Sequence, residues 1–142
     1  MQEKNNKSLL HAKHNDAAIK YIDRSPNHLD WVNTICFYSS LHYIRYYLFP
    51  ISLKTSNAGS YKIDHFDEYC KHFKNTHLKL SKHEKLLNLV AKLCPDISYE
   101  YNKLMDMSSL ARYTDYTADR NLSNLAKSFH KTIKEFCERK AN

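Results

Sequence analysis

The stretch at residues 30 to 50, DWVNTICFYSSLHYIRYYLFP, decides the fold class of this chain. It is apolar on almost every side at helical spacing, which is typical of a central helix buried by its neighbours. Pro50 ends the run because proline cannot continue a helix. We expect a helix over about 28 to 49 in which four large side chains are largely inaccessible to solvent: Trp31, Ile35, Phe37 and Leu41.

The overall composition also favours helices. One Gly and three Pro in 142 residues are too few for the many tight turns of a β-sandwich or barrel. The 42% of hydrophobic residues is enough for one compact core. We therefore predict an all-α fold, an up-and-down helical bundle of five to six helices. It forms a single domain over 1–142 with a loop insertion at about 50–64, roughly 65% or more helix and negligible strand.

Local signals place several of the other helices. Ser81 and Glu84 form a capping-box pattern, which predicts a helix that starts there. Further helices are expected over about 8 to 22, 65 to 73, 96 to 111 and 118 to 139. The last of these has the clearest apolar repeat, which we expect to face the core: Leu122, Leu125, Phe129, Ile133 and Phe136.

Cysteine, histidine and targeting signals exclude several classes of protein. The four cysteines stand singly with no C-x-x-C pair, which favours free thiols in a reducing compartment. His11 and His14 share a helix face, but no second close pair of ligands accompanies them, so we expect no metal and no cofactor. The best apolar stretch is interrupted by His42 and Arg45, and the N-terminus lacks the apolar run of a signal peptide. We expect a cytoplasmic protein with no membrane contact.

The charge of the chain indicates an anionic partner. Twenty-two Lys and Arg stand against fifteen acidic residues, a net charge of +7. Between positions 71 and 92 six lysines accompany Glu84 as the single acid. Such a positive field attracts polyanions, among them nucleic acids, although a solvated lysine face is the common alternative.

One group of polar side chains lies on the central helix. Tyr38, His42 and Tyr46 recur every four residues along one face, and Arg45 lies beside them. Burying an unpaired arginine is costly, so Arg45 must either pair or line a cleft. The two interpretations are an arginine at the exposed end of the helix and a polar cleft that binds an anion.

A second group of polar side chains lies in SSLARYTDYTADRN, where a predicted helix ends. Arg112, Tyr113, Asp115 and Tyr116 combine a guanidinium, phenols and a carboxylate, which is a suitable set to position a phosphate. The alternative is that Arg112 donates to the last carbonyl groups of its own helix.

Three motifs together resemble a branch of the HEPN-domain superfamily: DWVNTICFYSSLHYIRYYL, SKHEKLLNLV and YNKLMDMSSLARY. The similarity runs from about residue 8 to 138. HEPN domains are up-and-down α-helical bundles, often dimeric, that occur in toxin–antitoxin, CRISPR and other antiviral systems. They act as metal-independent ribonucleases or as binding partners of small nucleotidyltransferases. The resemblance implies a homodimer packed near the ARYTDY segment and a partner protein such as a nucleotidyltransferase.

The resemblance also places candidate site residues and exposes a departure. Arg112 matches the arginine of the family's catalytic motif, but no histidine follows it at the expected spacing, and Tyr116 is the nearest polar substitute. A phenol with a pKa near 10 is a poor general base at neutral pH. We expect three catalytic candidates to border one cleft: Arg112, His42 and His83. Four further residues are expected to bind the ligand: Arg45, Tyr116, Tyr113 and Tyr38.

Three functions follow from these features. The first is an RNA- or nucleotide-binding module of a toxin–antitoxin or antiviral defence system that works with a partner protein. The second is a metal-independent ribonuclease with a composite dimer site, in which Arg112 stabilises the phosphorane and His42 or His83 moves the proton. The third is a structural protein-interaction domain whose polar residues are internally satisfied. We take the first as the prediction.

Overall fold

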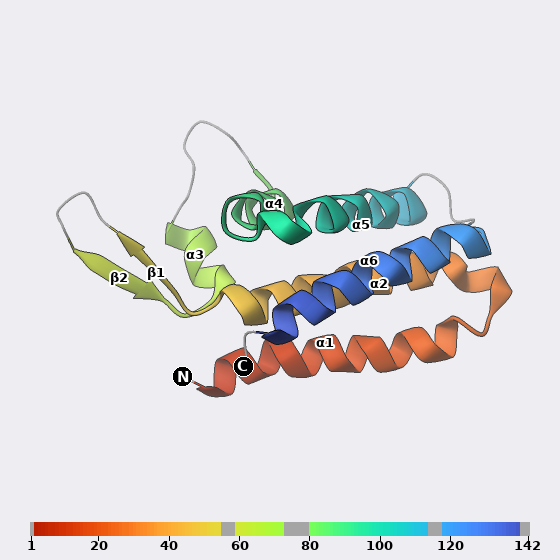
Figure 1. The fold of residues 1–142 in the computed structure, drawn as a ribbon, viewed down its shortest axis with the longest axis horizontal. Coiled ribbons are helices and arrows are strands. Elements are labelled where there is room, and N and C mark those ends of the chain that lie inside the picture. The colour runs from red at the N-terminus through yellow and green to blue at the C-terminus, as the bar shows by residue number, and fades with distance from the viewer. Residues whose placement is uncertain (1, 55–58, 73–79, 114–117, 140–142) are drawn as a thin grey trace.

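A computed structural model describes residues 2–54, 59–72, 80–113 and 118–139. Across these residues the chain forms six α-helices, one short 3-10 helix and a two-stranded sheet (Figure 1). The elements in chain order are α1 (Gln2–Ile22), η1 (Pro26–His28), α2 (Leu29–Leu48), β1 (Ile51–Lys54), β2 (Ser60–Ile63), α3 (Phe66–His72), α4 (Lys82–Leu93), α5 (Pro95–Tyr113) and α6 (Arg120–Glu138). Helix makes up 82% of the described residues, which confirms the mostly helical fold.

The helix α2 lies at the centre of the molecule and contacts α1, α5 and α6. In Figure 1, α1 runs below α2, α5 runs above it, and α6 crosses in front of it. The side chains of α2 that face these neighbours are fully buried: Val32, Cys36, Phe37, Tyr43 and Ile44. The prediction of a central buried helix at this stretch is therefore confirmed in its main feature.

The fourth side of α2 is not covered in the same way, and one prediction is wrong there. Trp31 is 52% exposed and Ile35 is only half-buried, whereas Phe37 and Leu41 are buried as expected. Five residues at helical spacing make up this side, which we call the open stripe of α2: Trp31, Ile35, Tyr38, His42 and Arg45. Three neighbouring helices leave one side of a helix partly accessible, even when its sequence is apolar all round.

The segment expected as a loop contains a β-hairpin. β1 and β2 pair antiparallel with Ile51 opposite Ile63, and they lie at one end of the helical layers (Figure 1). Apolar and polar residues alternate in both strands, and Ile63 is fully buried against the core. Four-residue strands give too short an alternation to be distinguished from a loop by pattern alone. The described chain is thus a helical assembly with a hairpin at its edge rather than a pure bundle.

The apolar stripe predicted for the last helix is confirmed only in part: Ile133 is fully buried, and Phe129 and Phe136 pack half-buried against the core. Leu122 and Leu125 are 39% and 45% exposed. The buried face contains smaller and more polar residues: Ser123, Ala126, His130, Ile133 and Cys137. The two faces share Ile133 and are otherwise displaced by one residue, and a displacement of one residue corresponds to about 100° of rotation about the helix axis. This face packs against α2, where His130 Nδ1 lies 2.8 Å from Ser40 Oγ, so tertiary contacts override the stronger apolar stripe.

Two helix starts agree with their capping signals. The Ser81 hydroxyl accepts a hydrogen bond from the Glu84 N–H, and the Glu84 carboxylate accepts one from the Ser81 N–H, as a capping box requires. Asp119 accepts a hydrogen bond from the Leu122 N–H and caps α6. Among the helices described, none combines the length and the apolar composition that crossing a membrane would require.

Candidate functional site

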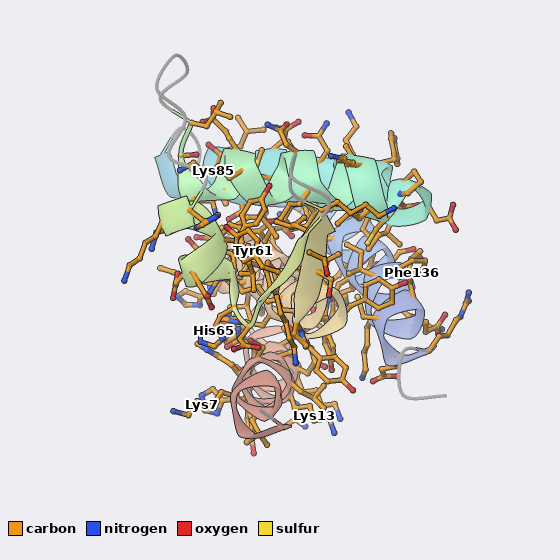
Figure 2. The ribbon with its side chains drawn as sticks, turned by 90° about the vertical axis from the view of Figure 1, so that its left-hand side faces the viewer. Lys7, Lys13, Tyr61, His65, Lys85 and Phe136 are labelled. Carbon is orange, nitrogen blue, oxygen red and sulfur yellow. The ribbon has the colours of Figure 1, made fainter. Side chains whose placement is uncertain are left out.

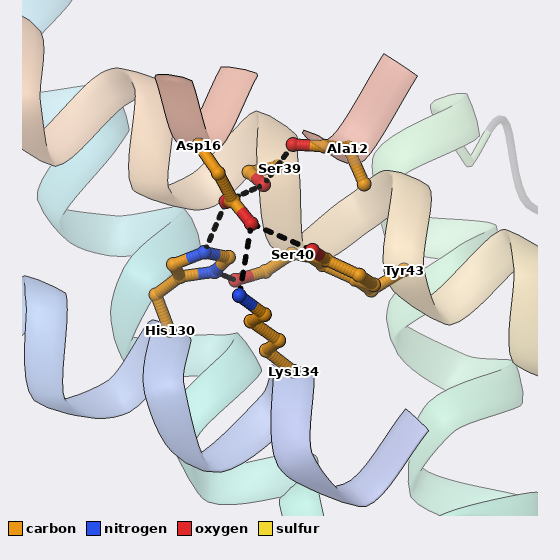
Figure 3. A network of polar contacts seen from close by, with 7 residues as sticks. All are labelled: Ala12, Asp16, Ser39, Ser40, Tyr43, His130 and Lys134. Atoms are coloured by element: carbon orange, nitrogen blue, oxygen red, sulfur yellow. Dashed lines mark hydrogen bonds and ion pairs between the residues drawn. The ribbon is translucent and has the colours of Figure 1, made fainter. Parts of the chain in front are cut away.

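A partly buried carboxylate joins three helices, as Figure 3 shows. Asp16 of α1 points between α2 and α6. Its Oδ1 accepts hydrogen bonds from Ser39 Oγ at 2.6 Å and from His130 Nε2 at 2.7 Å. Its Oδ2 accepts one from the Tyr43 hydroxyl at 2.6 Å, and Lys134 Nζ lies 3.5 Å away. These partners satisfy a charge that would otherwise be unfavourable at this depth.

The contacts of this carboxylate determine its protonation. Burial raises the pKa of Asp16, but the hydrogen bonds from His130, Ser39 and Tyr43 outweigh burial and hold it well below its ordinary value. Burial and the neighbouring Asp16 raise the pKa of Tyr43, so the phenol remains a donor. The Asp16 network, defined as Asp16, Ser39, Ser40, Tyr43, His130 and Lys134, therefore carries an ionised carboxylate at neutral pH.

Part of the Asp16 network has the connectivity of a Ser–His–Asp triad. Ser40 Oγ lies 2.8 Å from His130 Nδ1, and the other ring nitrogen binds Asp16. A neutral ring that donates from Nε2 accepts from Ser40 at Nδ1. However, Ser40 is 0% exposed, so its hydroxyl cannot reach a substrate. We interpret the Asp16 network as a connection between α1, α2 and α6 rather than as an active site.

The open stripe of α2 carries the polar residues that the sequence singled out there. Tyr38, His42 and Arg45 are all partly exposed on one side of the helix. The His42 ring stacks on His11 of α1, with ring centroids 3.8 Å apart and planes 22° apart. Burial, with the nearby His11 and Arg45 charges, lowers the pKa of His42 to about 4, so this ring is neutral at pH 7. His83 of α4 packs edge-on to Tyr38 at 6.0 Å.

The open stripe ends at a pocket of about 210 Å³, which we call the Arg45 pocket. Its lining comes from α1, the end of α2, and the junction between β2 and α3: Lys7, Ser8, Arg45, Phe49, Asp64, His65, Phe66 and Asp67. The Arg45 guanidinium lies over the Phe66 ring, 4.8 Å from its centroid. Its Nε is buried and has no hydrogen-bond partner within the described residues. An acceptor that entered the pocket could bind this donor.

The Arg45 pocket is lined by charges of both signs, and its two cations, Lys7 and Arg45, form no ion pair with a carboxylate among the described residues. Two carboxylates line it, and each has a lysine nearby: Lys82 Nζ lies 3.3 Å from Asp67 Oδ1, and Lys62 Nζ lies 4.0 Å from Asp64 Oδ1. The Asp64 Oδ1, like the Arg45 Nε, is buried without a hydrogen-bond partner among the described residues. In Figure 2, which looks at the end of the molecule with the hairpin, Lys7 and His65 both lie on the left-hand side of the view.

The structure brings together some of the predicted site residues. Tyr38, His42 and Arg45 share the open stripe, and His83 packs against it. Arg112 and Tyr113 belong to the last turn of α5, at the opposite end of the helical layers from the end of α2 in Figure 1. Their side chains, and all of Tyr116, lie outside the described residues.

Other contributors to the site were not identified from the sequence. Lys7 of α1 and His65 of the hairpin–α3 junction reach the pocket of Arg45 only in the folded chain, and His11 of α1 likewise reaches His42. Lys7 and His11 are about one helical turn apart, and so are His42 and Arg45. This shared spacing is a signal in the sequence, but the sequence alone does not show that the two helices lie side by side. Among the described residues no group of three or more His, Cys, Asp or Glu is arranged to hold a metal ion.

Comparisons with known proteins add no assignment: no protein family, no curated protein and no solved structure matches this chain. The site must therefore be interpreted from its own geometry. It consists of the open stripe of α2, with aromatic and cationic side chains, and the Arg45 pocket at its end.

Proposed function

We propose that this chain binds RNA, with a phosphate group in the Arg45 pocket and bases along the open stripe of α2. The observation that carries the proposal is the buried Arg45 Nε, which has no hydrogen-bond partner among the described residues. An unsatisfied buried donor is unfavourable, and a phosphate oxygen is an acceptor that would relieve it. Lys7 beside it adds a second positive charge.

The size of the pocket favours a phosphate of an RNA backbone over a whole nucleotide. Sites for complete small molecules usually enclose about 300–1,000 Å³. The Arg45 pocket, at about 210 Å³, is smaller than that range. It suits one phosphate group, and the remainder of the ligand would lie outside the pocket, along the adjoining surface.

The adjoining surface has the side chains that single-stranded RNA requires. Trp31, Tyr38 and His42 follow one another along the open stripe of α2. Aromatic rings beside a positively charged groove bind single strands because bases stack on them while cations follow the backbone. The net charge of +7 supports association with a polyanion over other ligands.

The wider role in this proposal rests on the resemblance of the three sequence motifs. A HEPN-like RNA- or nucleotide-binding module of a toxin–antitoxin or antiviral defence system would act as a homodimer and with a partner protein, such as a nucleotidyltransferase. The location of the polar set on α2 is compatible with this role, because the open stripe leaves one surface of the central helix accessible to a ligand.

The test is a binding titration of a fluorescein-labelled single-stranded RNA, measured by anisotropy and by the fluorescence of Trp31, the single tryptophan of the chain. Arg45→Met removes the guanidinium but keeps an apolar stem over Phe66. We expect a loss of about tenfold or more in affinity, the equivalent of one charge-assisted hydrogen bond. The slope of log K against log salt should fall by about 0.7.

Lys103→Met is the matched control for this titration. Lys103 is exposed on α5 and lies over the Tyr99 ring at 5.6 Å, so the substitution removes a cation from an aromatic ring without touching the site. We expect it to change affinity far less than Arg45→Met. Equal affinity of the wild type and Arg45→Met would contradict the proposal, as would an unchanged Trp31 emission at saturation.

A further inference from the structure

A second and larger pocket lies on the other side of the hairpin from the Arg45 pocket. Its volume is about 600 Å³, within the range of about 300–1,000 Å³ that is typical of small-molecule sites. It is lined by the end of α2, by β1 and by the last turns of α4 and α6: Tyr47, Leu48, Ile51, Ser52, Leu53, Lys92, Leu93, Phe136 and Arg139. In Figure 2, Phe136 and His65 lie on opposite sides of the hairpin.

The lining of this second pocket is mainly apolar. Ile51 and Leu53 alternate with exposed residues along β1, so both turn toward the helices. The Tyr47 ring packs on Phe136, with ring centroids 5.0 Å apart. Leu93 adds apolar surface at the edge, where it is 42% exposed. A ligand that covered these side chains would remove apolar surface from water, which favours binding.

Two cations belong to the same lining. Lys92 is in the last turn of α4, and Arg139 is the C-terminal cap of α6. Both are exposed, and neither has an ion pair with a carboxylate among the residues that the structure describes. The C-terminal ends of α4 and α6 carry partial negative charge, which stabilises the positive charges of Lys92 and Arg139 although neither has an acidic partner of its own.

We propose that this second pocket binds a small amphipathic carboxylate, whose apolar chain covers the leucines and Phe136 and whose charged group meets Lys92 and Arg139. The apolar lining alone would accept any hydrophobic molecule. The two cations select among such molecules, because a carboxylate accepts hydrogen bonds from both side chains while a neutral head group gains much less. The inference does not depend on RNA binding, since the Arg45 pocket shares no lining residue with this one.

The experiment is an NMR titration of the full ¹⁵N-labelled chain with octanoate and, in parallel, with 1-octanol, which has the same chain length without the charge. The expected result is saturable shifts of amides in the lining, such as those of Leu53, Leu93 and Phe136, with octanoate binding more tightly. The double variant Lys92→Gln/Arg139→Gln should weaken octanoate about tenfold, roughly 1.4 kcal/mol, and leave octanol nearly unchanged.

Two further variants complete this experiment. Lys20→Gln/Lys103→Gln removes the same charge from exposed positions outside the pocket and should leave octanoate affinity unchanged. Leu93→Glu changes an exposed residue, so the fold is retained, and should weaken both ligands because it places a charge on the apolar surface. The proposal is overturned if octanoate gives no saturable shifts in the wild type, or if its affinity is the same in the Lys92→Gln/Arg139→Gln variant.

Discussion

The substitution Asp16→Asn tests the Asp16 network most directly. The wild-type carboxylate accepts hydrogen bonds from Ser39, Tyr43 and His130, and Lys134 Nζ lies 3.5 Å from it. An amide has one oxygen, so its NH₂ group must face at least one of the donors that the carboxylate now satisfies. The substitution also removes the negative charge opposite Lys134 and His130.

The size of the effect follows from these contacts. Removing one partner of a buried charged pair destabilises a protein by about 3–5 kcal/mol. Because the Asp16 side chain retains 18% exposure, water can reach part of the site. We therefore expect the lower end, a loss of about 3 kcal/mol in the free energy of unfolding. Ser39→Ala, which removes one donor and leaves the charge, should lose only about 1 kcal/mol.

Urea unfolding followed by circular dichroism at pH 7 measures both losses. Asp106→Asn is the matched control, because Asp106 is exposed on α5, and we expect a change within about 0.5 kcal/mol. The folded-state pKa of Asp16 is lowered, so its stabilisation is present above the unfolded pKa of 3.8 and is lost as the pH falls through the folded value. The difference between wild type and Asp16→Asn should therefore shrink below about pH 4. A loss under about 1 kcal/mol at pH 7 would refute the assignment of the network as a connection between helices.

Three other predictions concern the surface. The pKa of His42 falls from 6.5 to about 4 on folding, so the unfolded chain binds a proton first and stability decreases as the pH falls from 6.5 toward 4. The urea midpoint of the wild type should therefore be lower at pH 5 than at pH 7, and His42→Gln should make this difference smaller. An unchanged difference would count against the stacked, neutral ring. The exposed Leu122 and Leu125 lie near the start of α6, a few residues after the ARYTDY segment through which the resemblance implies a homodimer. Leu122→Glu/Leu125→Glu should give a monomer in sedimentation velocity. A monomeric wild type at tens of micromolar would contradict the dimer. The resemblance assigns Arg112 to a catalytic motif, and Arg112 lies outside the Arg45 pocket. If the protein cleaves RNA, Arg112→Ala should abolish cleavage with the helical signal intact, and a chelator should have no effect. Unchanged cleavage in this variant would contradict a catalytic role for Arg112.

The local sequence was sufficient for most of the helices and for several of their ends, but not for the short β-hairpin. Apolar residues on every side of residues 30 to 50 predicted the central helix, because only burial by several neighbours makes such a helix stable. Ser81 and Glu84 predicted the start of α4, because a capping box satisfies backbone donors through residues three apart. The polar group at Tyr38, His42 and Arg45 was also visible, since one helical face needs only spacing to be recognised.

The direction in which each face points was decided by the tertiary structure. The apolar stripe of α6 predicted that Leu122 and Leu125 point inward, yet the helix is rotated by about one residue and buries His130 instead. His130 is stable there only because Asp16, 114 positions away in the sequence, comes from another helix to bind it. A periodic pattern fixes how wide an apolar face is, whereas the partner that covers it depends on contacts between distant segments.

The same distinction applies to the candidate site. The sequence identified Arg45 as an arginine in an apolar helix that must either pair or line a cleft. Whether it has a partner depends on Lys7, His65 and Phe66, which approach it only when α1 and the hairpin–α3 junction fold against the end of α2. Spacing along one helix is a local property, but the lack of a hydrogen-bond partner for the Arg45 Nε among the described residues is a property of three segments packed together.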